Sequence, residues 1–364
     1  MEEAKVFWKF KPDEQDLLLP IALGRFGSIT GKNESLYSLI YTIDTGIGLP
    51  KFLVAKAPKI PFEADIVTVR GHLIRALHEI NAIHQICHHP SIHNFGRAEV
   101  LFGIPFLISP KRHATLRDVV EEGPLGIVDV LVISIQIARS IEYIQSKGII
   151  CHQDLKAENV FIDFIDEKFS TDGKSLVKHQ VFLADFDLVN WAVLNGQPYG
   201  SRPYQAPEQY EKKSPVKFDK IDVFALGVNI VEMLTGGLHP LGERTTDVWP
   251  KSTKGNKWMR EDPWKKWARD PFISEGLNLD LESRLLVLIR ELLSPAYAKR
   301  PCITDTKERL LQILKEHDEH VYNQICVCLA FWDSAAIEGE SSGWPHMDLL
   351  INNLNRQLGK EIEI

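Results

Sequence analysis

The sequence contains few cysteines and no long uncharged apolar run. Its five cysteines are an odd number, scattered over 364 residues. Because a chain of this length can bury a core without disulfides, we expect reduced thiols and a reducing compartment. The most apolar stretch, residues 128–144, contains Asp129, Gln136, Arg139 and Glu142. These polar groups are too many for a membrane span, so we expect none.

The chain also lacks an excess of positive charge. A net charge of -7 argues against a general nucleic-acid binder, which normally presents a basic surface. Residues 1–5 are mostly charged where a secretory signal needs an apolar stretch, so no such signal is expected. We therefore expect a cytoplasmic protein, with delivery into another cell as a secreted effector as the alternative.

What the chain does have is an ordinary globular composition and one octet, residues 152–159, that groups the side chains needed for phosphoryl transfer. Asp154 can accept the proton of an attacking hydroxyl, and Lys156 can reach the transferring phosphate. Asn159 can hold a metal through its carbonyl oxygen, and Asp185 supplies the carboxylate that magnesium prefers. The octet therefore predicts a phosphoryl-transfer site.

The octet H-Q-D-L-K-A-E-N and the later D-F-D resemble the H-R-D-x-K-x-x-N and D-F-G motifs of eukaryotic-type protein kinases. This resemblance implies an α+β bilobal fold, with a small antiparallel sheet and one helix in the N-lobe and a larger, mainly helical C-lobe. It also implies ATP and magnesium as cofactors, with manganese as an alternative, and a protein substrate. We place an N-terminal extension at 1–16, the N-lobe at 17–108, the C-lobe at 109–314 and a helical extension at 315–364.

Residues 17–57 are rich in apolar residues with glycines between them, which predicts short antiparallel strands. Within them, Gly24, Phe26 and Gly27 look like a shortened glycine-rich loop, in which backbone N–H groups can approach phosphate. An ordinary hairpin turn would have a similar sequence. The phosphate-binding interpretation depends on the motifs farther along the chain.

Lys56 ends a V-A-K run that is similar to the strand lysine of the family's V-A-I-K motif. The resemblance assigns it to the α- and β-phosphates, with Lys51 and Lys59 as local rivals. Glu79, in a helical stretch before an H-P-S-I turn, is the predicted acidic partner. Glu63 is the alternative, but its neighbours match the family less well.

The run from Pro105 to Lys111, followed by residues 115–118, looks like the family's strand, hinge and first helix, which join the two lobes. In the register we favour, the carbonyl of Ser109 and the N–H of Lys111 face the adenine, with Ile108 at the rear of the pocket.

Downstream motifs extend the resemblance to about residue 314. Residues 200–208 resemble G-T-x-x-Y-x-A-P-E, and the K-R-P at 299–301 resembles the family's closing motif. These motifs imply an ion pair between Glu208 and Arg300, and bonds from Asp222 to the backbone near the catalytic loop. His152 is assigned a structural role, tying that loop to the metal motif.

Three other segments have simpler interpretations. Apolar residues at helical spacing predict a helix over 128–146, which Lys147 and Gly148 would end. The polar residues between Asn159 and Asp185 suggest an extended hairpin. Four tryptophans among lysines at 249–267 could bind bases or an acidic partner, but packing is the preferred interpretation.

The two departures from the family motifs carry predictions of their own. The resemblance implies an activation segment at residues 188–205, on which the family's arginine binds a phosphate. Gln153 is neutral and cannot make that pair, so activation by phosphorylation of this segment is not expected. Asp187 replaces a glycine; it is either an extra carboxylate near the metal or, as we prefer, a tolerated substitution.

These observations together predict an active protein serine/threonine kinase. One rival is a pseudokinase that serves as a nucleotide-binding scaffold, which the irregular glycine loop, Gln153 and Asp187 would suit. A second rival is a small-molecule kinase of the aminoglycoside or choline type. That class lacks the A-P-E segment, which is present here.

Overall fold

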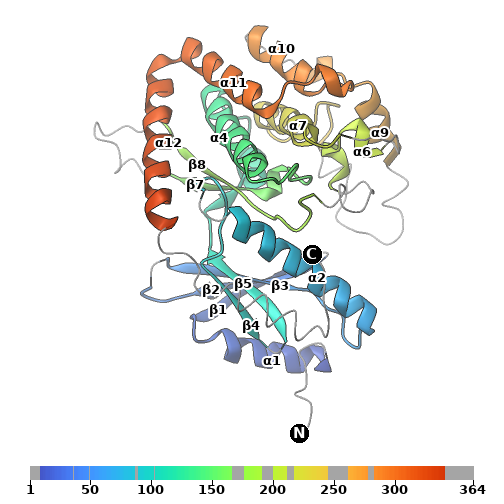
Figure 1. The fold of residues 1–364 in the computed structure, drawn as a ribbon, viewed down its shortest axis with the longest axis vertical. Coiled ribbons are helices and arrows are strands. Elements are labelled where there is room, and N and C mark those ends of the chain that lie inside the picture. Colours follow the sequence, from blue (N-terminus) through green and yellow to red (C-terminus); the bar gives the residue numbers. More distant parts are fainter. Residues whose placement is uncertain are drawn as a thin grey trace. The chain divides into compact units, whose positions relative to one another are not determined.

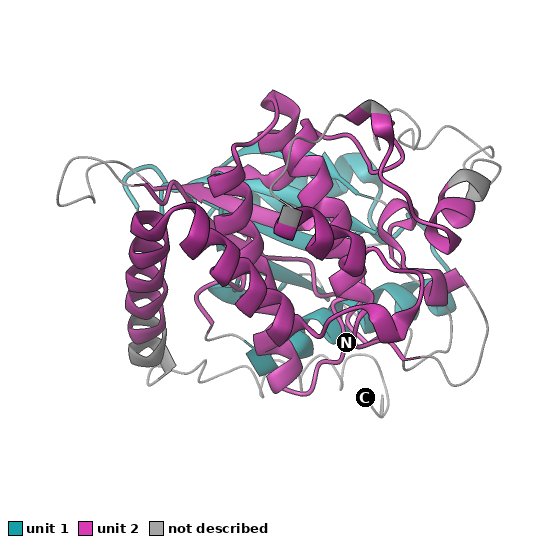
Figure 2. Ribbon diagram, turned by 90° about the horizontal axis from the view of Figure 1, so that it is seen from above, with its two compact units in different colours: residues 1–87, 94–111, 339–364 teal, residues 88–93, 112–338 magenta. Residues whose placement is uncertain are grey.

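The computed structural model describes most of the chain in two compact units, each of which is treated by itself (Figure 2). Unit 1 comprises residues 1–87, 94–111 and 339–364, and unit 2 comprises 88–93 and 112–338. The described residues are 9–35, 37–48, 50–86, 89–101, 103–165, 176–190, 200–210, 217–244, 261–277 and 283–340.

Unit 1 contains a five-stranded antiparallel sheet with the strand order β1-β2-β3-β5-β4 (Figure 1). The strands are β1 (Ser28–Glu34), β2 (Ser38–Asp44), β3 (Phe52–Pro58), β4 (Arg97–Leu101) and β5 (Ile104–Pro110). The helices are α1 (Pro12–Leu23) and α2 (Ile66–Ile86). The lobe boundary expected after residue 108 falls inside β5.

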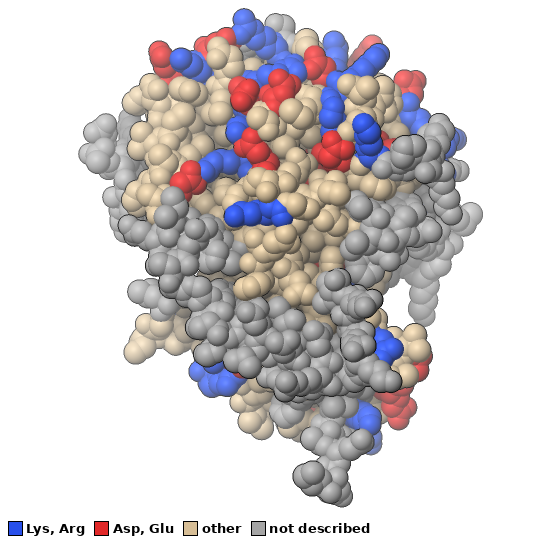
Figure 3. Space-filling view, viewed as in Figure 1, with Lys and Arg blue, Asp and Glu red and all other residues tan. Residues whose placement is uncertain are grey.

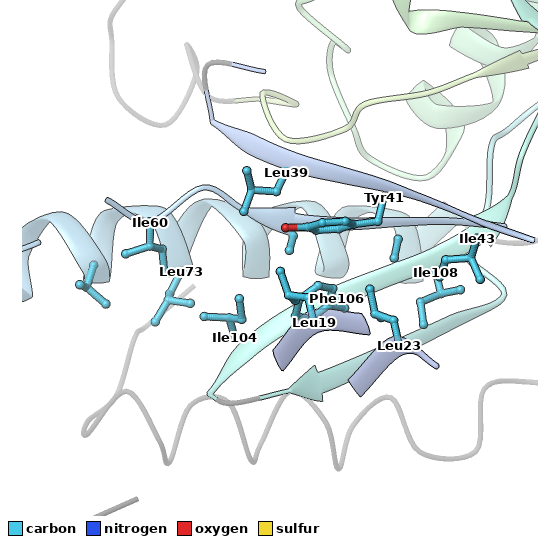
Figure 4. Packing of buried hydrophobic residues seen from close by; sticks show 13 residues of the cluster. Leu19, Leu23, Leu39, Tyr41, Ile43, Ile60, Leu73, Ile104, Phe106 and Ile108 are labelled. Carbon is cyan, nitrogen blue, oxygen red and sulfur yellow. The ribbon is translucent and has the colours of Figure 1, made fainter. Parts of the chain in front are cut away.

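Helix α1 stands where the sequence suggested a strand. Leu19 and Leu23, one helical turn apart, are at most 1% exposed and belong to the apolar cluster on the sheet (Figure 4). Leu17 and Ile21 on the same helix are more than 70% exposed. The sequence of α1 is therefore not amphipathic, because apolar residues lie on both faces of the helix. One of these faces is buried against the sheet and the other is exposed.

The two faces of strand β3 have different neighbours. Ala55 and Ala57 are buried in the cluster that includes the α1 leucines. Since side chains alternate along a strand, Lys56 projects from the opposite face. In the register of the sheet, Lys56 lies opposite Ile40 of β2 and Leu107 of β5.

Unit 2 is mainly helical and has a small three-stranded sheet, ordered β6-β7-β8. Its strands are β6 (Ala114–Thr115), β7 (Val160–Phe164) and β8 (His179–Leu183). Its helices are α3 (Leu116–Glu122), α4 (Ile127–Ser146), α6 (Pro207–Tyr210), α7 (Ile221–Thr235), α9 (Glu261–Arg269), α10 (Ser283–Leu292), α11 (Ile303–His317) and α12 (Glu319–Glu340). Short 3₁₀ turns are η2 (Ala157–Asn159), η4 (Arg202–Tyr204), η6 (Glu275–Leu277) and η7 (Tyr297–Lys299).

Helices α4 and α7 form the centre of unit 2. Residues Ile221 to Met233 of α7 are all buried, and α4 packs against α7, β8 and α11 (Figure 1). The helix predicted over 128–146 is confirmed, and its stop is as expected. Lys147 donates its N–H to Tyr143, and Gly148 takes a left-handed φ of 86°.

The last described helix, α12, belongs to unit 2 as far as Glu338. Val321 and Ile325 are buried in it, and Asp333 forms an ion pair with Arg139 of α4. The side-chain oxygen of Gln324 accepts the N–H groups of residues 176 and 177 at 2.8 and 2.9 Å. Helix α12 therefore also fixes the chain just before β8. The polar tip of the expected hairpin and residues 341–364 lie outside the described residues.

Acidic and basic side chains of unit 2 are interspersed on the face of the molecule that Figure 3 shows. Several are paired, among them Lys307 with Glu142 and Arg309 with Glu291. In the part of the chain that is described, no helix combines the length and apolar character that crossing a membrane requires. Trp264 and Trp267 are buried around His239, so packing explains these two tryptophans. Residues 245–260, which hold Trp249 and Trp258, lie outside the described residues.

Candidate active site

Helix α7 holds in place the catalytic loop of unit 2, residues 152–159. Both carboxylate oxygens of Asp222 accept backbone N–H groups of the loop, from His152 at 2.7 Å and from Gln153 at 2.8 Å. Asp222 is 1% exposed, so these bonds form in a dry interior and leave the loop little freedom. The predicted contact of Asp222 with this backbone is thus present.

His152 links the loop to the metal motif. Its Nε2 lies 3.0 Å from the carbonyl oxygen of Ala184, and its ring meets Phe186 edge-on at 5.1 Å. The side chain is fully buried. The expected structural role fits this position, which is held by packing and one backbone contact.

Asp154, Lys156 and Asn159 converge in the loop. Lys156 Nζ lies 2.7 Å from Asp154 Oδ2 and 3.0 Å from Ser201 Oγ. Asn159 Nδ2 donates to the backbone oxygen of Asp154 at 2.8 Å and to its Oδ2 at 3.1 Å. The backbone N–H of Ser201 donates to Asp154 Oδ1 at 2.7 Å. Asp154 is therefore oriented by Lys156, Asn159 and a residue of the activation segment.

The charge state of Asp154 follows from these neighbours. Burial raises the pKa of its carboxyl, but the Lys156 ammonium and the hydrogen bonds outweigh burial and hold the pKa below 3.8. Burial lowers the pKa of Lys156, and Asp154 more than reverses this, so the pKa of the ammonium lies above 10.5. A carboxylate beside an ammonium is the expected state at neutral pH.

Asn159 and Asp185 offer the donor set expected for a magnesium ion. The Asn159 amide nitrogen is engaged by Asp154, so a metal ion would be held through the amide's carbonyl oxygen. Among the described residues, no three His, Cys, Asp or Glu side chains gather into a metal-binding group. Magnesium is commonly held by one or two protein oxygens with water and phosphate, so the pair fits that ion.

The activation segment passes very close to the catalytic loop at Gly200. Its φ is 108°, and a Cβ there would lie 2.4 Å from the carbonyl oxygen of Gln153. Only glycine satisfies both conditions. Gln153 itself is buried with a φ of 76°, and its side chain is neutral where the family places arginine.

Asp187 does not need the backbone freedom of a glycine. On either side of it, Asp185 and Asn190 have left-handed φ values of 65° and 55°, whereas Asp187 does not have a positive φ. Its side chain is buried, with 7% exposure. The substitution is therefore compatible with the local backbone, which agrees with the preferred interpretation of Asp187.

The predicted ion pair between Glu208 and Arg300 is present. The Arg300 side chain has no exposed surface and also donates from Nη1 to the carbonyl of Lys220 at 3.0 Å. These contacts tie helix α6, which follows the activation segment, to the start of α7 and to the segment before α11.

Sequence reasoning missed a second buried network in unit 2. Arg117 of α3 donates to Tyr204 and to Glu232 of α7, and its Nε reaches Glu158 of the catalytic loop at 3.1 Å. The Tyr204 hydroxyl in turn donates to Glu232 at 2.8 Å. A lone arginine in a short helix carried no motif, and its partners are 41 to 115 residues away.

In unit 1, Lys56 and Glu79 form the predicted pair, with 2.7 Å between Nζ and Oε1. Glu79 is 4% exposed, so this pair lies in the interior of the unit. The local rivals have other positions: Lys59 pairs with Glu34, and Glu63 precedes α2 with a left-handed φ of 54°. The choice of Glu79 over Glu63 is supported by this geometry.

The alternative interpretation of Gly24, Phe26 and Gly27 as a hairpin turn is wrong, because the segment joins helix α1 to β1. A Cβ at Gly27 would lie 2.1 Å from the carbonyl oxygen of Asp44, so close backbone packing already requires glycine there. The guanidinium groups of Arg25 and Arg97 lie 4.8 and 5.6 Å from the centre of the Phe26 ring. Phosphate binding by this segment stays a prediction.

The hinge register also needs correction at one residue. The N–H of Lys111 donates to the carbonyl of Phe52 at 2.9 Å, so it is engaged inside the sheet and does not face a base. Ser109 is buried in β5, opposite Val54. Strand β5 continues to Pro110, two residues beyond the end of the N-lobe that was predicted at residue 108.

With this geometry in place, comparison with known families is decisive. The family model described as "Protein kinase domain" matches residues 65–311, which is more than half of the chain. The chain belongs to the protein kinase family. The match covers the catalytic loop and metal motif of this kinase domain, whereas Lys56 lies before it, so the Lys56 assignment depends on the structure.

Several curated kinases are similar to this kinase domain. An interferon-induced, double-stranded RNA-activated protein kinase from Rattus norvegicus is 36% identical over 104 residues, 27% of this chain and 17% of that protein. A protein kinase and PP2C-like domain-containing protein from Arabidopsis thaliana is 32% identical over 200 residues, 50% of this chain and 28% of that protein. Serine/threonine-protein kinase US3 of human herpesvirus 2 is 29% identical over 145 residues, 37% of this chain and 30% of that protein. The matches thus span less than a third of these relatives.

Proposed function

We propose that the protein transfers the γ-phosphate of ATP to serine and threonine hydroxyls of a protein substrate, without needing phosphate on its own activation segment. The observation that carries this proposal is the oriented Asp154 carboxylate, with Lys156 and Asn159 bonded to it. The names of relatives that are serine/threonine-protein kinases support the same activity.

In this proposal Asp154 receives the proton of the acceptor hydroxyl as that oxygen attacks the γ-phosphorus of ATP, while the bond from this phosphorus to the β,γ-bridging oxygen breaks and ADP leaves. Its lowered pKa keeps it ionised at neutral pH, and its orientation by Asn159 and Ser201 aims the carboxylate at one position. Lys156 holds a positive charge beside the reaction centre. Asp185 and Asn159 would hold magnesium, or manganese, which neutralises phosphate charge when bound.

Independence from loop phosphorylation is supported by two features of unit 2. Gln153 offers no cation for a phosphate. The segment around Ser201 is already fixed by its backbone hydrogen bond to Asp154 Oδ1 and by its contact with Lys156. Ser201 is therefore held against Asp154 and Lys156 without being modified.

Both rival functions predict different measurements. A pseudokinase scaffold would bind ATP without transferring phosphate, and the buried Asp187 beside the metal motif is the feature that favours it. A small-molecule kinase would phosphorylate a metabolite and no protein. The Glu208–Arg300 pair, which fixes the segment expected to face a protein substrate, argues against it.

The test is transfer of labelled phosphate from ATP to a cell protein extract and, in parallel, to a metabolite extract. The intact protein is compared with Asp154→Ala and Asp185→Ala, and ATP binding to each variant is measured as a control for folding. Label on proteins that both substitutions abolish supports the proposal. Label only on metabolites, or no transfer despite ATP binding, would overturn it.

A further inference from the structure

The turn between β1 and β2 contacts helix α2 through one aromatic side chain. The Arg75 guanidinium of α2 lies 3.8 Å from the centre of the Tyr37 ring. The His72 ring, three residues earlier on the helix, is 6.4 Å from the same ring. The Tyr37 ring therefore lies beside two side chains that are three residues apart on one face of α2.

The turn that carries Tyr37 is held by its own hydrogen bonds. Ser35 Oγ accepts the N–H groups of Tyr37 at 3.3 Å and Ser38 at 2.9 Å. The carbonyl of Tyr37 accepts the N–H of Lys59 at 2.8 Å, and Lys59 also pairs with Glu34 of β1. The ring is therefore presented from backbone that is fixed to both β1 and the end of β3.

Arg75 is four residues before Glu79 on α2. Residues at this spacing lie on the same face of a helix, one turn apart. A contact that fixes Arg75 against the sheet therefore also limits the rotation and sliding of α2 at Glu79. That limit matters because Glu79 must reach Lys56 of β3, which it does at 2.7 Å.

We propose that Tyr37 and Arg75 are positioning residues that hold α2 so that Glu79 stays paired with Lys56. This inference rests on the proposed function, since it supplies what would keep the Lys56–Glu79 pair formed when the activation segment carries no phosphate. Both residues belong to unit 1, and the turn between β1 and β2 that carries Tyr37 contains no glycine.

Replacing Tyr37 by leucine removes the cation–π contact, and Tyr37→Phe keeps it while removing only the hydroxyl. An exposed contact of this kind corresponds to about a two- to fivefold change in an equilibrium or rate. We expect kcat/KM for ATP to fall by about that factor in Tyr37→Leu and to stay near the intact value in Tyr37→Phe. Arg75→Met should match Tyr37→Leu, and the double variant should lose no more than either.

A second readout does not depend on turnover. Amide hydrogen exchange over residues 66–86 should be faster in Tyr37→Leu and unchanged in Tyr37→Phe. Tyr322→Leu is the matched control, because it removes a similar contact with Lys315 in unit 2. It should change neither ATP kinetics nor exchange in α2.

The outcomes separate the two proposals. Equal losses in Tyr37→Phe and Tyr37→Leu, or unchanged exchange in α2 for Tyr37→Leu, would overturn the positioning role. If the intact protein transfers no phosphate to protein but α2 exchange responds as expected, the positioning role stands and the proposed function fails.

Discussion

The Glu208–Arg300 pair permits a quantitative prediction. Arg300→Met keeps most of the side-chain volume but removes the partner of Glu208 and the donor to the Lys220 carbonyl. The arginine is fully buried, and the Glu208 side chain is 16% exposed. Breaking a buried pair by removing one partner costs about 3–5 kcal/mol, and the partial exposure of Glu208 places this case near 3 kcal/mol.

The assay is urea unfolding of the whole chain, followed by a probe of unit 2 and paired with measurement of kinase activity. The double variant Glu208→Gln with Arg300→Met should be less destabilised than the sum of the single changes, because no unpaired carboxylate remains. Arg284→Met is the matched control. Arg284 and Glu316 form an ion pair with 60% and 33% exposed side chains, so its loss should destabilise the protein far less than the loss of the buried pair.

A stability loss in Arg300→Met no larger than that in Arg284→Met would refute this reasoning. It would mean that the buried pair contributes no more to the free energy of unfolding than an exposed pair does. Full additivity in the double variant would also contradict the account, since it would show that the two side chains do not interact.

Three further predictions concern the catalytic loop, the activation segment and the metal motif. Lys156→Met should move the acid limb of the kcat/KM profile to higher pH, because without the ammonium the pKa of Asp154 rises and the carboxylate is protonated earlier; an unmoved limb would contradict this. Gly200→Ala should lower activity at least about tenfold, since its Cβ would displace the Gln153 carbonyl that adjoins Asp154; near-normal turnover would be inconsistent with so close an approach of the two backbones. Asp187→Gly should keep substantial metal-dependent activity, and its complete loss in a folded variant would show that this carboxylate is required.

The catalytic loop was the part most open to prediction from sequence. Asp154, Lys156 and Asn159 are within six residues of each other, so their types and spacing almost determine their meeting. The pairing of Lys56 with Glu79 was predicted from the resemblance of the V-A-K strand and the following helix to the family's motifs. The family match then confirmed the fold class that the resemblance had implied.

The errors arose where long-range packing decides the outcome. The apolar run before Gly24 has no polar alternation, so strand and helix could not be separated by pattern, and Pro20 inside it argued against a helix. The glycine at 27 is required by the backbone of Asp44, which is 17 positions away and carries no motif. Likewise, the engagement of the Lys111 N–H depends on the register of β5 against β3.

The central claim is that the unmodified chain transfers phosphate from ATP to protein through Asp154. The most direct measurement takes protein treated with phosphatase, shown by intact mass to carry no phosphate, and follows the initial rate of labelled transfer to a protein substrate pool. We predict transfer from the first turnover without a lag, and its loss in Asp154→Asn despite retained ATP binding. Activity that appears only after Ser201 or another activation-segment hydroxyl is phosphorylated would contradict the account.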